Sequence, residues 1–354
     1  MTSLKDQHGV ALVMAMLIVA LVAAISVDVS WRFDLSLARS GNRWYGMQAE
    51  SYLEGGESLA KLALEQDAAD NEYDHLGEGW AADGSTFDTD EGGYISGRVE
   101  DAQGRINLNA LGTPYNTAPG LADWQKMSAP QRRFLRLLQT INLSTEISVD
   151  EETQEEILLE FDQAKNILEA VIDWIDADSN ITGFGGAEAD DYNQLEPVIT
   201  ISNGPMASVT ELQILKGMTP ELYKGLLPFV IALPSSEEVL LNVNTVSLEV
   251  MRSLNKQDTL TPLLVEEAQA LKDEIDPEVG LATVDEFLAL PSAGTLFGAG
   301  GENSSFDTAG LTTASNYFLF FGEVAVGDHT KRGNSLLKRE EGKVSTIRRT
   351  DSSF

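Results

Sequence analysis

The stretch VALVMAMLIVALVAAISV, residues 10–27, decides the fold of this 354-residue chain. None of its 18 residues is charged, and Ser26 carries its single hydroxyl. As an α-helix it would be roughly 27 Å long, close to the hydrocarbon thickness of a bilayer. Lys5 and Asp6 precede it, and Asp28 ends it. The stretch therefore predicts a membrane-spanning helix that carries the rest of the chain outside the membrane.

Three interpretations of this apolar run are open. A cleaved secretory signal fits poorly, because the run exceeds the usual apolar core of about 7–15 residues and residues 25–28 form no small-x-small cleavage site. A plain signal anchor fits the length. A prepilin-type leader, cut between Gly9 and Val10, also explains the glycine at the boundary between polar and apolar sequence. In that third case the apolar helix stays on the mature protein.

The helical pattern continues well beyond the apolar run. Apolar and small residues recur at alternating spacings of about three and four, which places them on one face of a helix. They are Trp31, Leu35, Ala38, Tyr45, Ala49, Tyr52, Gly56, Leu59 and Ala63, and no proline occurs before Pro114. One helix from about residue 10 to 66 would be roughly 85 Å long. The alternative is two helices broken near Gly41 or Gly46.

The composition limits the classes of function. A net charge of −32 repels nucleic acid phosphates and anionic lipid surfaces and attracts cations such as Ca²⁺. Apolar residues make up 43% of the chain, enough for packed cores. The chain has no cysteine, which excludes disulfides and thiolate chemistry, and its three histidines lie far apart in sequence, which argues against a zinc site.

The remaining chain predicts an α+β protein. After an acidic loop at residues 67–91, alternation on both sides of residues 102–104 predicts a β-hairpin over residues 93–111. Helical periodicity dominates from Pro114 to about Leu233, with helices expected from Ser128, over residues 153–174, over residues 208–215 and from Thr219 to Val230. Residues 317–327 and 344–347 read as strands, with the seven Lys and Arg residues of 331–349 expected on the solvent face.

These residues carry a resemblance to a known family. The Gly9-Val10 junction with its long amphipathic continuation resembles the type IV prepilin-like proteins, most of which have a glutamate five residues into the mature chain. Met14 stands at that position, a feature of the K-type minor pseudopilins of type II secretion systems (the GspK family). The stretch EDAQGRINLN at residues 100–109 resembles the same family more specifically, and WIDAD at 174–178, NGP at 203–205 and NVNT at 242–245 also match it. The resemblance is weak between residues 255 and 316.

The resemblance implies a particular fold. It is a pilin-like long N-terminal helix packed on an antiparallel sheet, with a large all-helical insert of the SAM-like or helix-hairpin-helix-like kind. The implied parts are a prepilin leader at 1–9, a transmembrane helix at 10–30, a pilin-like α/β part at 31–112, two insert subdomains at 113–235 and 236–304, and closing strands at 305–354.

The resemblance also implies a function. The expectation is a non-enzymatic minor pseudopilin that caps the tip of the periplasmic pseudopilus and helps to initiate its assembly for export of folded proteins. Expected partners are the I-type and J-type minor pseudopilins, the prepilin peptidase and the inner-membrane secretion platform. The chain would be methylated at its mature N-terminus and would cross the bacterial inner membrane once, with its globular part in the periplasm.

Two other classes of function are weighed against this one. The first is a membrane-anchored periplasmic binding protein with a Ca²⁺-stabilised helical domain. The second is an envelope-anchored DNA receptor that uses the helix-hairpin-helix-like segment at residues 209–223. DNA binding is disfavoured there, because Lys216 and Lys224 stand against Glu211, Glu221 and the large negative net charge.

One stretch predicts a metal site. Residues 150–196 hold fifteen acidic residues and one basic residue, and Asp176, Asp178 and Asn180 have the D-x-D-x-N spacing that directs alternate oxygens toward a hard cation. The EF-hand match is incomplete, since Ile181 replaces the glycine and Ala187 stands at the twelfth position. A different loop closed by Glu188 or Asp191 could complete a Ca²⁺ site. The alternative is a solvated acidic loop; the resemblance favours a structural Ca²⁺ ion.

Overall fold

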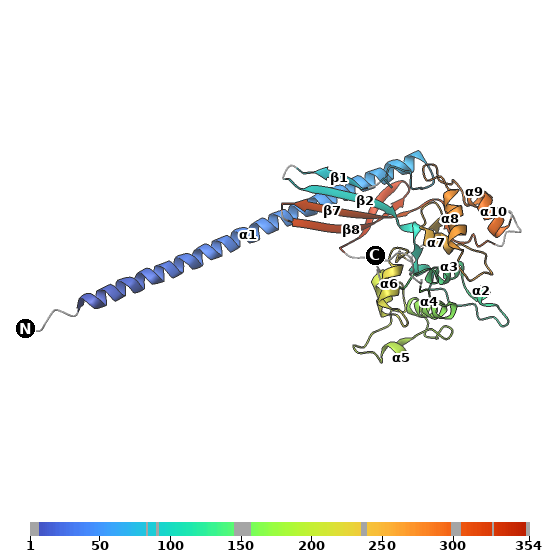
Figure 1. The fold of residues 1–354 in the computed structure, drawn as a ribbon, viewed down its shortest axis with the longest axis horizontal. Helices are drawn as coiled ribbons and strands as arrows, with labels where there is room; N and C mark the ends of the chain where they lie inside the picture. Colours follow the sequence, from blue (N-terminus) through green and yellow to red (C-terminus); the bar gives the residue numbers. More distant parts are fainter. Residues whose placement is uncertain are drawn as a thin grey trace, which may run out of the picture.

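The structure is a computed structural model that describes residues 7–82, 84–89, 92–144, 157–234, 239–298, 306–327 and 329–351. A single helix, α1 (Gln7–Asp70), runs without a break past Gly41 and Gly46, which confirms the one-helix prediction. Its 64 residues correspond to roughly 96 Å. Figure 1 shows the first half of α1 projecting alone and the second half lying along a sheet.

Burial along α1 changes abruptly where the sheet begins. The large apolar side chains from Val10 to Met47 are exposed, whereas Ala49 is 1% and Leu64 0% exposed. The predicted apolar face is therefore covered only in its second half, and even there Leu59 stays 59% exposed. The uncovered apolar length is greater than a bilayer needs, because Trp44 is also exposed.

The sheet has the order β1-β2-β7-β8-β9, with every neighbouring pair antiparallel. Its strands are β1 (Ser85–Asp88), β2 (Tyr94–Asp101), β7 (Tyr317–Val326), β8 (His329–Glu340) and β9 (Lys343–Thr350). The central strand β7 is buried on both faces. Phe318 and Phe320 pack with Leu64 of α1, while Tyr317 and Leu319 pack with Leu336 and residues of the insert. This explains the unbroken apolar start of β7, which an alternating half-buried strand would not have.

The predicted hairpin over residues 93–111 is wrong. β2 pairs with β1 and β7, whereas β3 (Ile106–Asn107) pairs in parallel with β4 (Val230–Ile231). The turn between them, η1 (Ala102–Gly104), directs the chain out of the sheet and into the insert. Gln103 fixes this exit, because its Oε1 accepts the N–H groups of Asn316 and Tyr317, where the chain returns. An alternation of apolar and polar residues indicates that a strand is half-buried, but it does not show which strand pairs with it.

The insert occupies the chain between β2 and β7 and contains mainly short helices (Figure 1). They are η2 (Leu108–Ala110), α2 (Asp123–Lys126), α3 (Ala129–Leu138), α4 (Phe161–Ile175), α5 (Ala189–Tyr192), η3 (Val209–Ile214), α6 (Pro220–Leu226), α7 (Leu248–Arg252), α8 (Val265–Asp273), α9 (Val284–Ala289) and α10 (Pro291–Phe297). A second parallel pair joins β5 (Leu241–Asn242) to β6 (Leu311–Thr312).

Three expected helices differ from their predicted form. α4 begins at Phe161, since residues 157–160 are not helical and residues 153–156 lie outside the described residues. Gln163 accepts the N–H of Glu160 at 3.0 Å, which caps the helix there. Residues 209–214 form a 3₁₀ helix although Ser208 and Glu211 make the predicted capping box. α6 ends at Leu226, so that Val230 can join β4.

Three arginines of α3 hold loops of the insert. Arg136 is 0% exposed and donates to the carbonyls of Ser253, Lys256 and Thr259. Arg133 donates to carbonyls at residues 307 and 309, and Arg132 forms an ion pair with Asp307. Buried guanidinium groups are tolerated here because loop carbonyls and one carboxylate satisfy their donors.

The basic residues of the last strands are not all on the solvent face, contrary to the prediction. Arg339 is half-buried beside Phe318 and forms ion pairs with Asp67 and Asp74 at 2.9 and 2.6 Å. Arg349 reaches Glu57, a buried residue of α1, at 2.7 Å. Burial raises the pKa of Glu57, but hydrogen bonds from Arg349 and its neighbours outweigh that effect and hold the pKa below its usual value. These strand residues therefore fasten α1 to the sheet.

Candidate metal centre

The candidate site is built on one face of α4. Glu169 and Asp173 are spaced four residues apart and Asp176 follows three residues later, so the three carboxylates lie one above another. The chain after α4 folds back along this face. Asp173 accepts the N–H of Thr182 at 3.0 Å, and Glu169 accepts the N–H groups of Phe184 and Gly185 at 3.0 and 2.8 Å. The returning loop is thus held through its backbone.

Glycines make this close approach possible. A Cβ atom at Gly185 would lie 2.2 Å from Cα of Asn166, and one at Gly186 would lie 2.2 Å from Oδ2 of Asp173. Gly183 has φ +59, a conformation that residues with a side chain rarely adopt. Any larger residue at these positions would push the loop away from α4.

The returning loop brings Glu188 to the end of α4. One carboxylate oxygen from each of Asp176, Asp178 and Glu188 lies within 4.8 Å of the others. Asp176 and Glu188 are each 5% exposed, and Asp178 is the more exposed member. Oδ1 of Asp176 and both carboxylate oxygens of Glu188 are buried and find no hydrogen-bond partner among the described residues. Buried polar atoms normally have a hydrogen-bond or ionic partner, and a bound cation would supply one to these oxygens.

The electrostatics of the cluster agree with this reading. Burial, reinforced by Asp178 and Asp173, raises the pKa of Asp176 to about 6. Burial together with Asp173 and Asp176 raises the pKa of Glu188 to about 7. At neutral pH the protein alone therefore stabilises these negative charges poorly, and a bound cation would lower both pKa values.

Two of the five predicted ligands lie outside this cluster of three. Both the backbone N–H and the Nδ2 of exposed Asn180 donate to Asp178 at 2.7 Å, so Asn180 shapes the turn. Oδ2 of Asp191 accepts the N–H of Glu188 at 3.2 Å, which caps α5 and fixes the backbone of Glu188. The structure thus brings together Asp176, Asp178 and Glu188 and gives the other two supporting contacts.

Asn203 is a candidate ligand that the D-x-D-x-N spacing missed. Its Nδ2 donates to the backbone carbonyl of Asp178 at 3.1 Å, and its Oδ1 is buried without a partner in the described part of the chain. Its φ of +42 turns the backbone so that the side chain reaches the loop. The sequence signal was the NGP motif at residues 203–205, since Asn tolerates positive φ better than most residues.

The oxygen set fits a hard cation. Ca²⁺ takes 6–8 oxygen ligands in flexible geometry, with water completing the shell. The cluster offers carboxylates from three residues, and the amide group of Asn203 contacts the backbone of one of them, Asp178. A second acidic group, made of Asp67, Asp74 and Glu78, has the same compactness. There Arg339 binds Asp67 and Asp74, so that group already has its cation.

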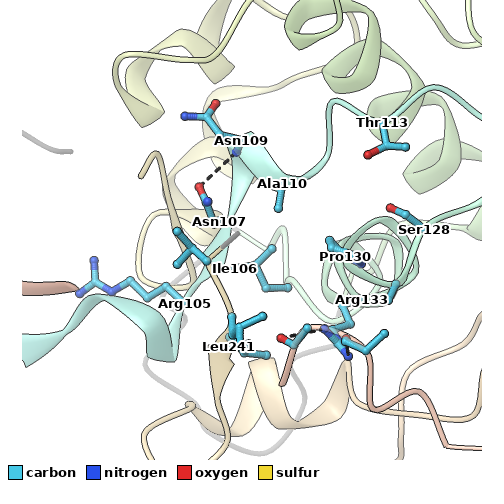
Figure 2. A pocket seen from close by; sticks show the side chains of 15 residues that line it. Arg105, Ile106, Asn107, Asn109, Ala110, Thr113, Ser128, Pro130, Arg133 and Leu241 are labelled. Atoms are coloured by element: carbon cyan, nitrogen blue, oxygen red, sulfur yellow. Dashed lines mark hydrogen bonds between the residues drawn. The ribbon is translucent and has the colours of Figure 1, made fainter. Parts of the chain in front are cut away.

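A cavity of about 370 Å³ lies within the insert, lined by residues around β3, β5 and α3 (Figure 2). Figure 2 shows Asn107 hydrogen-bonded to Asn109 on one wall and Arg133 on another. The cationic groups on the wall have protein partners: Arg133 binds loop carbonyls, and Arg105 binds Glu100. We therefore base the candidate site on the acidic cluster and treat this cavity as an internal feature of the insert.

The predicted processing site lies at the opposite end of the molecule. Gly9 and Val10 lie within the first turn of α1 and are exposed. The helix from Gly9 to Asp70 is long and apolar enough to cross a membrane by length and composition. This helix fits a single-pass membrane anchor, and together with the antiparallel sheet it defines a pilin-like protein that carries a helical insert.

Comparisons with known proteins identify the family. Residues 104–235 match the family model described as type II secretion system (T2SS), protein K. Type II secretion system protein K of Pseudomonas aeruginosa is 31% identical over 353 residues, 98% of this chain and 93% of that protein. The protein K of Pectobacterium carotovorum is 31% identical over 346 residues, 97% of this chain and 96% of that protein. The chain therefore belongs to the type II secretion system protein K family, which consists of minor pseudopilins.

A solved structure supports the fold. A chain of the GspK-GspI-GspJ complex from enterotoxigenic Escherichia coli matches with a TM-score of 0.68 and 23% sequence identity, over 89% of this chain and 100% of that one. This likeness confirms the predicted class, a long N-terminal helix on an antiparallel sheet with a large helical insert.

Proposed function

We propose that this minor pseudopilin caps the tip of a periplasmic pseudopilus and helps to initiate its assembly. The observation that carries the proposal is the position of the insert. It lies at the end of the molecule farthest from the N-terminus, beside the last part of α1 with α9 and α10 reaching past its end, and it is much broader than the helix (Figure 1). Subunits of a pilus stack through their N-terminal helices, so an insert at that end leaves no room for a subunit above it.

Met14 supports the same position. In a pilus stack the usual glutamate neutralises the charged N-terminus of a neighbouring subunit, as the family resemblance implies. Met14 is an exposed apolar residue of α1 and offers no such charge. A subunit that lacks the acid can begin a stack but is poorly suited to receive another subunit above it.

Processing is the second part of the proposal. The prepilin peptidase would cut between Gly9 and Val10 and leave a methylated amine on Val10, so that the apolar helix remains on the mature chain. Before assembly α1 would then hold the protein in the inner membrane, next to the secretion platform, with the insert in the periplasm. The exposure of both residues at the start of α1 leaves the bond accessible.

The proposed partners are the I-type and J-type minor pseudopilins. Two observations support this choice. The related chain was solved in a complex named for GspI and GspJ. In addition, Trp31, Phe33 and Trp44 are exposed on α1 beyond the predicted span of residues 10–30, which gives partner helices an apolar surface to cover.

The proposed cofactor is one structural Ca²⁺ ion in the cluster of Asp176, Asp178 and Glu188, with Asn203 as a further ligand. The ion would offset the repulsion between buried carboxylates and would connect the end of α4 to the start of α5. The unpartnered oxygens of Asp176 and Glu188 support this proposal. No chemistry is assigned to the ion.

The decisive experiment makes two measurements on the full-length protein, which is expressed together with its secretion system. Mass spectrometry of the mature N-terminus should find a chain that begins at methylated Val10, and purification of the I-type pseudopilin should recover this chain together with the J type. A chain that keeps residues 1–9 would contradict the pseudopilin proposal. Uniform incorporation along the pseudopilus, instead of at its end, would contradict the tip position.

A further inference from the structure

Phe184 is exposed to an unusual degree for an aromatic residue. It is 99% exposed, more than any other large hydrophobic residue in the described part of the chain, and its neighbour Ile181 is 57% exposed. Single exposed apolar residues are common on protein surfaces. A fully extended phenylalanine is less common, because burying its ring even partly against its own protein would be favourable.

The loop that carries Phe184 is held firmly in place. Glu169 accepts the N–H of Phe184 itself and that of Gly185, and Lys216 donates to the carbonyl of Gly186 at 3.0 Å. The close contact between Gly185 and Asn166 leaves no space for the loop to move inward. The ring therefore extends from a fixed backbone, as do the aromatic anchors of tight protein interfaces, which lose little conformational entropy on binding.

The position of the loop argues against two possible occupants. α4 and α5 lie on the side of the insert away from α1 (Figure 1). The lipid around residues 10–27 is thus separated from Phe184 by most of the roughly 96 Å helix. The loop is followed by exposed Asp190 and by Asp191, which lies 3.8 Å from the Lys216 amine that holds the loop, in a chain of net charge −32. Both an anionic lipid surface and a second copy of this chain would be repelled.

We propose that Phe184 anchors a docking site for a protein outside the pseudopilin tip complex, whose surface offers an aromatic-sized apolar pocket surrounded by Lys and Arg side chains. The proposal rests on the tip function proposed above, since it requires the insert to face away from the other pseudopilins. The acidic residues around the loop would meet the basic rim, and the ring would fill the pocket. Loss of such a central anchor weakens an interface by about 30-fold or more.

The test uses Phe184→Ser in the full-length chain, in cells that contain the whole secretion system. The ring makes no packing contact within the chain, so the melting temperature and the recovery of the tip complex should stay at wild-type levels. Secretion should fall about tenfold or more, given the loss of a hot-spot residue. Leu264→Ser is the matched control, because Leu264 is 63% exposed on a different part of the insert. Wild-type secretion with Phe184→Ser would overturn the proposal.

A photo-crosslinking residue at position 184 tests the chemistry of the partner. The expected adduct is a protein other than the I-type and J-type pseudopilins, with Lys and Arg near the crosslinked peptide, and Asp190→Lys should reduce its yield. An adduct only with those pseudopilins or with lipid, or no adduct, would overturn the proposal, as would a higher yield with Asp190→Lys. Loss of the tip complex from the wild-type chain would instead indicate failure of the proposed function, because that readout does not involve position 184.

Discussion

We predict that Ca²⁺ reverses the order of stability between the wild type and a double variant of the acidic cluster. The double variant combines Asp176→Asn with Glu188→Gln. The raised pKa values, about 6 and about 7, correspond to at most ~3 kcal/mol of folding free energy for each ionised group, at ~1.4 kcal/mol per tenfold change in proton affinity. The more exposed Asp178 leaves one side of the cluster open to water, which screens these charges. We therefore halve the summed destabilisation of the two ionised groups, to ~3 kcal/mol for the pair. Without metal at pH 8 the double variant should be more stable by that amount.

The pH dependence follows from the same values. A group whose pKa is raised in the folded state stabilises the fold below its unfolded pKa and loses that contribution as the pH rises through the folded pKa. The metal-free wild type should therefore lose stability, relative to the double variant, as the pH rises from about 4 to about 8. Above about pH 8 the difference between the two proteins should be constant.

Calcium should reverse the order. At a Ca²⁺ concentration of 1,000 times its Kd, the wild type gains about 4.1 kcal/mol, which exceeds the ~3 kcal/mol advantage of the variant, while the variant, which lacks two charged ligands, gains little. Thermal unfolding of the full chain in detergent, with chelator and with Ca²⁺, measures both differences; ~3 kcal/mol corresponds to roughly 6–12 °C. Asp191→Asn is the control and should keep the calcium shift, because Asp191 lies outside the cluster. Equal calcium shifts in the wild type and the double variant, or a less stable variant in chelator at pH 8, would refute the reasoning.

Three further substitutions address how the fold is held, each checked by chemical unfolding. Glu57→Gln should cost about 2 kcal/mol above pH 5 and progressively less at lower pH, because the charge-assisted bond to Arg349 is lost and the pKa of Glu57 is low in the folded state. Arg136→Met should cost about 3 kcal/mol or more, since three loop carbonyls lose their donor. Gly185→Ala should lower the free energy of unfolding by about 1–3 kcal/mol, because the Cβ would collide with Asn166. It should also speed hydrogen exchange of the backbone amide at position 185.

Each of these substitutions has a matched control. Glu54→Gln removes an exposed carboxylate from the same helix as Glu57 and should change little. Arg136→Lys keeps one donor group and should fall between wild type and Arg136→Met. Gly294→Ala adds a Cβ where nothing lies within 4 Å and should leave stability unchanged or slightly higher. A cost for Gly294→Ala equal to that for Gly185→Ala would show that the collision is not the cause.

The long helix and the sheet strands were predictable because their signals are local. The spacing of residues 31–63 and the absence of proline determine α1, and the aromatic run at residues 317–327 determines β7. The pairing of β2 was not predictable. Its partner β7 lies more than 200 residues away in sequence, and the polar residues that turn the chain at Asp101 and Gln103 bind segments around residues 242 and 315.

The candidate site was predictable in part for the same reason. Asp176 and Asp178 share one turn of chain, so their spacing is visible in the sequence. The position of Glu188 depends on the glycines that let the loop fold back on α4, and that of Asn203 depends on a separate segment. Arg339 was expected in solvent, and the bond of Arg349 to Glu57 was not expected, because a strand pattern does not reveal that α1 presents carboxylates beside these two arginines.

The order of the strands has a consequence for synthesis of the protein. The sheet that covers α1 takes β2 from the first 101 residues and β7, β8 and β9 from the last 38 residues. While a ribosome is still making the insert, α1 has no sheet to pack on, and Arg339 and Arg349 do not yet exist to bind its carboxylates. The pilin-like body can therefore close only after β7, β8 and β9 have been made. A chain that stops before Lys343 would lack β9 and would leave Glu57 without Arg349, so that both its sheet and the contact of that sheet with α1 would be incomplete.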